Sequence, residues 1–173
     1  MNLYLLRHGI ATPRNDPGAE SDSDRPLTAQ GMKRMRKAAK GLRRLRIPFD
    51  AVLTSPLARA RQTAQIVADG LDLGDRLEEL AALAPDASVQ DLFSSLKPYK
   101  DRAHLLLVGH EPFLSTIMSH VLTRDEKRSI AVAFKKGGIC RVEIDAMPPD
   151  TAGTLHWLLT PKQLRALGAD SRR

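Results

Sequence analysis

The chain has 173 residues, of which 42% are hydrophobic, a proportion typical of a globular rather than a disordered protein. Arg7 interrupts the apolar N-terminus too early for a secretory signal, no apolar run approaches the roughly 18 residues of a membrane helix, and the single cysteine, Cys140, excludes an intrachain disulfide. A net charge of +7 favours anionic partners, namely nucleic acid, acidic protein surfaces or phosphorylated substrates. We expect one cytoplasmic domain over residues 1–173, with 169–173 as a frayed tail and with no membrane partner.

The chain opens with an apolar run, residues 3–6, that ends at Arg7, His8 and Gly9. This pattern predicts a buried strand that stops at a turn. Open α/β sheets bind ligands beyond the carboxyl ends of their strands. A neutral His8 imidazole could attack phosphorus there, and the Arg7 guanidinium could hold phosphoryl oxygens. These residues alone are also typical of an ordinary strand end facing water.

A loop rich in turn-forming residues follows and ends at Arg25. Thr28 then begins a predicted long helix, which forms a basic segment over residues 28–46. Its lysines and arginines could bind nucleic acid or an acidic partner, or they could simply face solvent. We favour the solvent-facing interpretation, because no aromatic residues alternate with the basic ones, and we assign no partner to this helix.

A second buried strand is predicted at residues 51–54, and it is followed by Ser55 as a helix N-cap and by Pro56 as the first helical residue. Arg59 falls in the first turn of that helix, where free backbone N–H groups already favour an anion. Its spacing alone fits an ordinary surface arginine equally well. Residues 74–86 are predicted to be a loop. A short helix is expected over residues 89–96, capped by Ser88.

Residues 105–108 are the strongest buried-strand signal in the chain, and His110 follows them beside Gly109. Pro112 is expected to begin the next helix, so that His110 lies between a strand end and a helix start. Residues 139–144 and 154–159 alternate in polarity and predict an antiparallel hairpin. Residues 160–163 form a capping box that opens a last helix.

The sequence lacks the motifs of several other types of enzyme. The chain has no Gly-x-x-x-x-Gly-Lys nucleotide loop, no Cys-x5-Arg phosphatase loop and no Gly-x-Ser-x-Gly turn. His104 and His120 have no metal-ligand spacing and are interpreted as structural, and His156 as outward-facing. We therefore expect no metal site.

The sequence contains four further motifs, Leu-Arg-His-Gly at 6–9, Arg-Pro-Leu-Thr at 25–28, Ser-Pro-Leu-Ala-Arg-Ala-Arg-Gln-Thr-Ala at 55–64 and Gly-His-Glu-Pro at 109–112. Together they resemble the histidine phosphatase superfamily. The short length, the Ser-Asp-Ser-Asp-Arg-Pro-Leu-Thr stretch at 21–28 and the late Trp157 with Thr160-Pro161 resemble its SixA-type phosphohistidine phosphatases. The resemblance implies an α/β protein, a single-domain three-layer α/β/α fold with a central mostly parallel sheet, phosphoglycerate-mutase-like and without a large cap insertion.

The resemblance also implies the roles of individual residues. His8 would be the nucleophile that becomes phosphorylated, and Arg7, Arg59 and His110 would hold the phosphoryl oxygens. Arg25 would line the pocket mouth and bind substrate. No metal or other cofactor is implied, because guanidinium groups take the place of a cation.

The resemblance does not decide whether Glu79 acts as a general acid. Larger members of the superfamily use a carboxylate after the second helix to protonate an ester leaving group, and Glu79 lies in the corresponding region. SixA-type members do not depend on such an acid, since a protonated imidazole leaves readily from phosphorus. Glu79 is thus either a substrate-site acid or a surface carboxylate.

The leading hypothesis is a metal-independent phosphatase for protein phosphohistidine, acting in signal transduction on a histidine phosphotransfer domain or a phosphocarrier and releasing phosphate. A phosphomonoester phosphatase for a small molecule or phosphoserine is the alternative within the same superfamily. A non-catalytic binder of acidic partners or nucleic acid ranks third, because a binder does not need Arg7, His8 and His110 together.

Overall fold

The computed structural model describes residues 1–15, 20–125 and 128–169. Residues 170–173, most of the predicted frayed tail, lie outside this range. Within it, one mixed sheet has the strand order β3-β2-β4-β1-β5-β6. The strands are β1 (Asn2–Arg7), β2 (Ala51–Thr54), β3 (Leu77–Glu79), β4 (His104–Gly109), β5 (Ile139–Glu143) and β6 (Thr154–Leu159).

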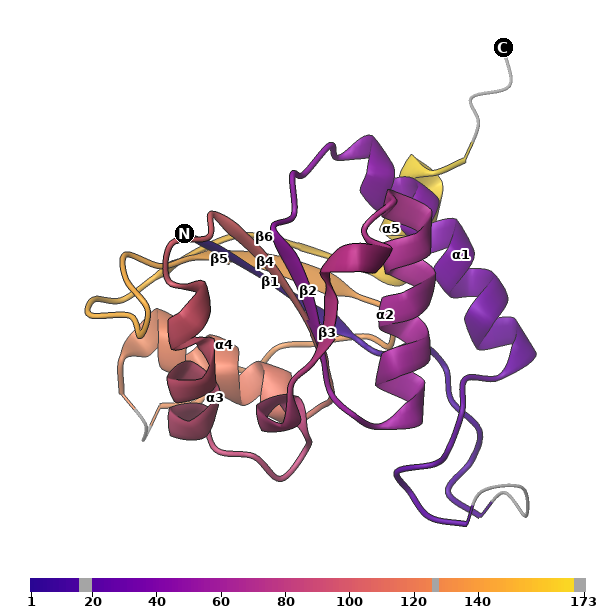
Figure 1. Cartoon of the computed structure of the whole chain (residues 1–173), viewed down its shortest axis with the longest axis horizontal. Coiled ribbons are helices and arrows are strands. Elements are labelled where there is room, and N and C mark those ends of the chain that lie inside the picture. Colours follow the sequence, from indigo (N-terminus) through magenta and orange to yellow (C-terminus); the bar gives the residue numbers. More distant parts are fainter. Residues whose placement is uncertain (16–19, 126–127, 170–173) are drawn as a thin grey trace.

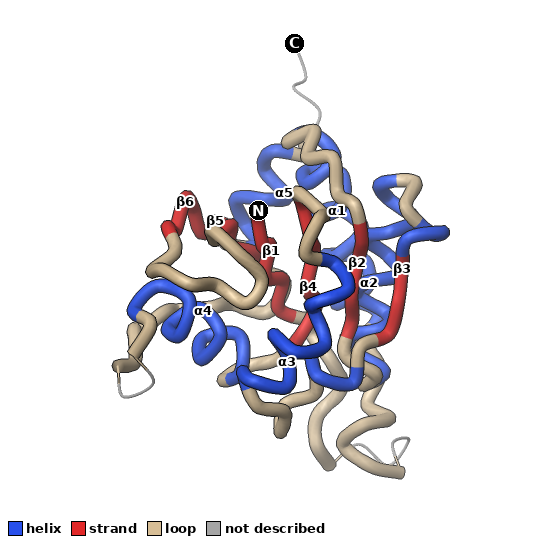
Figure 2. The backbone as a smooth tube through the Cα atoms, turned by 60° about the vertical axis from the view of Figure 1, so that its left-hand side comes forward, coloured by secondary structure: helices blue, strands red, loops and turns tan. Residues whose placement is uncertain are grey.

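Strands β3, β2, β4 and β1 run parallel to one another, and β5 and β6 add an antiparallel edge. Helices lie on both faces of this sheet (Figures 1 and 2). The helices are α1 (Ala29–Arg44), α2 (Ala58–Leu71), α3 (Val89–Leu96), α4 (Phe113–Thr123) and α5 (Pro161–Leu167), with short 3₁₀ helices at 74–76, 81–83 and 97–99. The predicted three-layer α/β/α fold with a mostly parallel sheet is confirmed.

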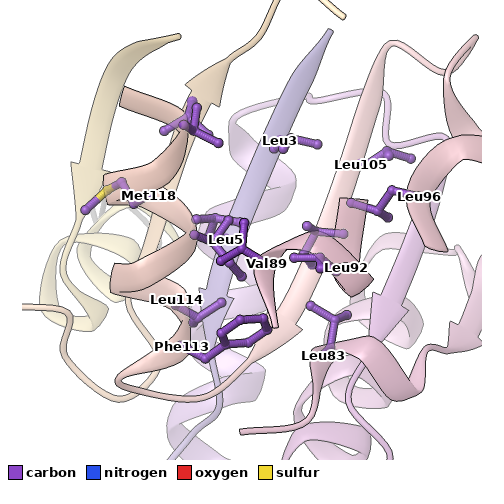
Figure 3. Packing of buried hydrophobic residues seen from close by; sticks show 14 of the residues in the cluster. Leu3, Leu5, Leu83, Val89, Leu92, Leu96, Leu105, Phe113, Leu114 and Met118 are labelled. Carbon is purple, nitrogen blue, oxygen red and sulfur yellow. The ribbon is translucent and has the colours of Figure 1, made fainter. Parts of the chain in front are cut away.

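The two hydrophobic clusters follow from the alternation of side chains along the strands. Leu3 and Leu5 of β1 face the layer of α3 and α4, as Figure 3 shows, whereas Tyr4 and Leu6 face the layer of α1, α2 and α5. Because both faces of the central strands are covered by helices, these strands are continuous apolar runs rather than alternating ones. This is why residues 3–6 and 105–108 gave such clear signals.

Most predicted boundaries agree with the structure. The Thr28 side chain caps α1 by accepting from the Gly31 backbone, Ser88 caps α3, and the capping box opens α5. The hairpin of β5 and β6 is also confirmed. In the described part of the chain, no helix has the length and hydrophobicity needed to span a membrane.

Two local predictions were wrong. Ser55 does not cap a helix at Pro56, because α2 begins at Ala58 with Leu57 in the cap position and without a side-chain cap bond. Residues 74–86 were predicted to be a loop, but they include the edge strand β3, whose three residues pair in parallel with β2. So short an edge strand, with exposed glutamates, carries almost no hydrophobic pattern.

Candidate active site

Three parallel strands bring the candidate residues to one edge of the sheet. Arg7 of β1 is level with Gly109 of β4, and Thr54 of β2 is level with Val108. The backbone N–H of His8 then donates to the Gly109 carbonyl at 3.0 Å. His8 and His110 therefore leave neighbouring strands side by side, with ring centroids 5.0 Å apart.

His8 is buried, with 7% of its surface exposed. Its Nδ1 lies 2.7 Å from the carbonyl oxygen of Gly9, and a carbonyl can only accept a hydrogen bond. Nδ1 therefore carries the proton, and Nε2 keeps its lone pair. The pKa of His8 is lowered to about 3, mainly by burial, with smaller contributions from His110, Arg59 and Arg7 that the hydrogen bond to Gly9 opposes. The ring is neutral at neutral pH, as a nucleophile must be.

His110 is also buried, and its Nε2 lies 2.8 Å from the hydroxyl oxygen of Ser55. Its Nδ1 has no hydrogen-bond partner. Burial lowers the pKa of His110 to about 4, with Arg59 adding to the effect, so this imidazole is neutral as well. When the Ser55 hydroxyl donates to Nε2, Nδ1 carries the ring proton and can donate it to an oxygen of a bound anion.

Arg59 is the second residue of α2 and is 4% exposed. Its two terminal nitrogens both bind Asp22, one donating to the backbone carbonyl at 2.6 Å and the other to the carboxylate at 3.0 Å. Arg25 binds the same carboxylate, through an ion pair of 2.8 Å. Asp22 therefore joins the two arginines, which lie in different segments of the chain.

The pKa values of this cluster reflect burial and ion pairing together. Burial lowers the pKa of Arg7 and of Arg59 from the usual arginine value, and nearby carboxylates, Glu111 for Arg7 and Asp22 for Arg59, partly offset that effect. The pKa of Asp22 is lowered: burial raises it, but Arg59 and Arg25 together outweigh burial. Asp22 is therefore an ionised carboxylate at neutral pH.

These residues surround one cavity of about 510 Å³. We call it the His8 cavity. Its lining residues are Arg7, His8, Ala11, Thr12, Pro13, Arg14, Asp22, Arg25, Arg59, Pro85, His110, Glu111 and Lys136.

Unpaired polar atoms gather around the His8 cavity. In the described part of the chain, the buried side-chain atoms without a hydrogen-bond partner are Arg7 Nε, Thr12 Oγ1, Arg59 Nε and His110 Nδ1. All four belong to residues that line this cavity. An unpaired buried polar atom costs about 1–3 kcal/mol, so four of them around one cavity indicate a site built for a ligand with several acceptor oxygens.

The structure brings five of the six predicted site residues together. Arg7, His8, Arg25, Arg59 and His110 all line the His8 cavity. Glu79 does not, because its carboxylate lies 3.4 Å from Arg61 and lines a separate pocket beside α2.

Sequence reasoning gave no role in the site to several polar residues, among them Asp22, Thr12 and Glu111 of the cavity lining and Ser55, which contacts His110. Ser55 and Glu111 belong to the recognised motifs at 55–64 and 109–112, and this was the signal available for them. Asp22 belongs to the stretch at 21–28 that resembles the SixA-type proteins, but that resemblance gave it no role. Thr12 lies in an irregular loop without periodicity. Among the residues that the structure describes, no group of three or more His, Cys, Asp or Glu side chains is arranged to hold a metal ion.

The chain is similar to known proteins over most of its length. The model of the histidine phosphatase superfamily (branch 1) matches residues 3–84. An uncharacterized protein of Picosynechococcus sp. is 43% identical over 95% of this chain and 99% of its own. The phosphohistidine phosphatase SixA of Escherichia coli is 29% identical over 95% of this chain and 97% of its own.

The fold comparison gives the same result. A solved structure of the protein histidine phosphatase SixA complexed with tungstate has a TM-score of 0.80 and 29% identity, covering 95% of this chain and 99% of that one. The chain belongs to the histidine phosphatase superfamily. Within it, the chain is similar in sequence and fold to SixA, and this similarity supports a phosphatase.

Proposed function

We propose that the protein hydrolyses phosphohistidine on another protein, through a phosphohistidine formed on His8. Four buried polar atoms without hydrogen-bond partners belong to residues that line one cavity together with the buried, neutral His8, and this observation carries the proposal. Phosphoryl transfer depends mainly on positioning and on stabilising charge at the phosphoryl oxygens. The similarity to SixA adds support for this substrate class.

In the first step, Nε2 of His8 attacks phosphorus and the bond from phosphorus to the substrate imidazole breaks. The electron pair of that bond stays on the leaving nitrogen, which takes up a proton. In the second step, water attacks the phosphorus on His8, releasing phosphate and restoring the neutral ring. Arg7, Arg59 and His110 donate hydrogen bonds to the phosphoryl oxygens during both transfers.

The two carboxylates in the described lining of the cavity are not arranged as proton donors, and this favours an imidazole leaving group over an alcohol. The described lining contains two carboxylates, Asp22 and Glu111. Asp22 is ionised and bound to Arg59 and Arg25, so it has no proton to give. Glu111 accepts two hydrogen bonds from Ser115. An alkoxide needs a proton donor to leave, whereas an imidazole leaves once it takes a proton from water.

The test is phosphate release from a chemically phosphorylated histidine peptide and from an aryl phosphate ester, with a metal chelator present. His8→Asn is the control, since asparagine can still donate to the Gly9 carbonyl but cannot be phosphorylated. We expect fast release from the peptide and loss of release in the variant. Release from the ester alone would instead favour the phosphomonoester phosphatase. Folded protein that releases phosphate from neither would refute the proposed activity.

The cellular setting follows from the substrate class. A phosphohistidine protein, such as a histidine phosphotransfer domain or a phosphocarrier, would place the enzyme in cytoplasmic signal transduction. We propose that setting together with the reaction.

A further inference from the structure

A second, much smaller pocket adjoins the His8 cavity. It has a volume of about 30 Å³ and is lined by residues of the loop after β1 and of helices α1 and α5. Lys136 lines both this pocket and the His8 cavity. Arg34 of α1 and Arg165 of α5 complete its charged lining. We call Arg34, Lys136 and Arg165 the basic strip.

The charged residues that line the small pocket are all cations. The described residues that line the small pocket include these three cations and no carboxylate. Arg34 and Lys136 are exposed and Arg165 is half-buried, so their charged groups are accessible from solvent. Three neighbouring cations create a local positive potential that attracts anions. The small volume of the pocket suits a single carboxylate group better than a larger ligand.

The basic strip is held rigidly relative to His8. Helices α1 and α5 pack side by side (Figure 1), and a Cβ at Gly41 would lie 1.8 Å from the Leu164 carbonyl oxygen. Similarly, a Cβ at Gly31 would lie 2.1 Å from the carbonyl oxygen of Ile10, two residues after His8. Gly41 thus allows the backbones of α1 and α5 to touch, and Gly31 allows α1 to touch the loop after β1. The helices that carry Arg34 and Arg165 are therefore held in fixed positions relative to each other and to the loop that follows His8.

We propose that the basic strip binds an acidic surface of the phosphohistidine protein, next to the phosphorylated residue. This inference rests on the proposed function and extends it to the class of protein that the enzyme accepts. A substrate whose phosphohistidine enters the His8 cavity must place its neighbouring residues over the cavity rim, where Lys136 begins the strip. Glutamate and aspartate side chains at that position complement Arg34 and Arg165.

A protein surface suits the strip better than nucleic acid does. Single-stranded nucleic acid is bound by aromatic stacking along a basic groove, and the described lining of the small pocket has no aromatic side chain. Charges at the rim of an interface act mainly on the association rate and on its salt dependence. The strip is therefore expected to act on kcat/KM for a protein or peptide substrate, and not on the chemistry at His8.

The test compares two phosphohistidine peptides that differ only in the residues beside the phosphohistidine, four glutamates in one and four glutamines in the other. At low salt we expect the wild-type enzyme to favour the glutamate peptide in kcat/KM by about tenfold, the lower end of typical electrostatic effects. In Arg34→Glu/Arg165→Glu that preference should fall to unity or reverse. Turnover of an aryl phosphate ester, which does not reach the strip, should stay within about twofold.

A matched control comes from the opposite edge of the sheet. Lys100 and Arg102 are exposed and lie just before β4 begins, so Lys100→Glu/Arg102→Glu makes the same change in net charge far from the cavity. The control variant should keep the preference for the glutamate peptide. Arg34→Gln/Arg165→Gln removes the two charges without placing an acid in the last turn of α5, and it serves if the glutamate variant does not fold.

Each outcome decides a different question. An unchanged preference in the strip variant, or no preference in the wild type, would overturn the proposal while leaving the phosphohistidine activity intact. Loss of binding to an oligonucleotide in the strip variant, with the peptide preference kept, would assign the strip to nucleic acid and also overturn it. A wild type that cleaves the ester but neither peptide would refute the proposed function itself, and the acidic-substrate proposal with it.

Discussion

Asp22 binds both terminal nitrogens of Arg59, one through its backbone carbonyl at 2.6 Å and the other through its carboxylate at 3.0 Å. The two residues are 37 positions apart in the chain, one in the loop after β1 and the other in α2. This contact holds the guanidinium of Arg59, a residue that lines the His8 cavity and whose buried Nε has no hydrogen-bond partner. The loop thus completes a site that the strand ends begin.

The first prediction separates two effects of Asp22. In Asp22→Ala, Arg59 loses its bond to the carboxylate and keeps only the bond to the backbone carbonyl of residue 22, so the guanidinium can turn. We expect kcat to fall about tenfold, since small misplacements in a site are costly. The lost negative charge should at the same time strengthen competitive inhibition by phosphate. Steady-state kinetics with phosphate as inhibitor measures both effects. Asp24→Ala, in the same exposed loop, is the control; equal effects in the two variants would contradict this role of Asp22.

Loss of the Arg59 side chain should lower kcat far more than loss of the Asp22 carboxylate. Arg59→Ala removes a donor to the phosphoryl oxygens, and we expect kcat to fall by about 10²–10³, as is typical when one transition-state donor is lost. Arg61→Ala is a matched control, because Arg61 lies on the same helix but pairs with Glu79 outside the cavity. Should both variants keep wild-type turnover of a phosphohistidine peptide, Arg59 has no part in the reaction.

Ser55 is expected to act through His110. In Ser55→Ala, Nε2 of His110 loses its partner, and the tautomer with a proton on Nδ1 is no longer favoured. A hydrogen bond of about 1 kcal/mol corresponds to a fall in kcat of about fivefold. Nitrogen NMR of the His110 ring should show the changed tautomer. Ser55→Thr keeps a hydroxyl and should restore both the tautomer and kcat. Ser119→Ala removes another buried serine, and a merely structural role for Ser55 would make the two variants alike.

The sequence allowed the strand-end part of the site to be predicted. Buried parallel strands are uninterrupted apolar runs, so the positions of Arg7, His8 and His110 could be found from local patterns, and the parallel topology predicted that they would meet. The same reasoning placed Arg59 near them. Local information was sufficient because each residue directly follows, or begins, a regular element.

The positions of the other site residues depend on contacts between segments that are distant in the sequence, and these could not be predicted. Asp22 lies in an irregular loop, and nothing in its neighbourhood indicates that it binds Arg59. Ser55 had a sound local interpretation as an N-cap, which failed because its hydroxyl instead contacts His110, 55 residues away. Glu79 was found from its position after the second helix, but the side chain pairs with Arg61 on the outer side of β2.

The position of Glu79 yields a fourth prediction. Because its carboxylate lies outside the His8 cavity and near Arg61, it has no path to a leaving group there. Glu79→Gln should therefore change turnover of both an aryl phosphate ester and a phosphohistidine peptide by less than about twofold, as is usual for an exposed ion pair. A selective loss of ester turnover would show that Glu79 does serve as a general acid.

The lowered pKa values of His8 and His110 predict how stability depends on pH. Their pKa values are about 3 and about 4 in the folded protein, against the usual 6.5 when unfolded. Between pH 6.5 and pH 4 the unfolded chain therefore binds more protons, so stability falls as pH falls. Each histidine contributes up to about 1.4 kcal/mol per pH unit.

Urea unfolding between pH 7 and pH 4 tests this expectation. The pKa of Asp22 is lowered from 3.8, so its own contribution is lost only at the acid end of the range. His8→Asn should be less stable at pH 7 but should lose stability more slowly on acidification, because one of the two neutral buried imidazoles is gone. If wild type and variant have the same slope, His8 is not held neutral by burial, and its readiness as a nucleophile would need another cause.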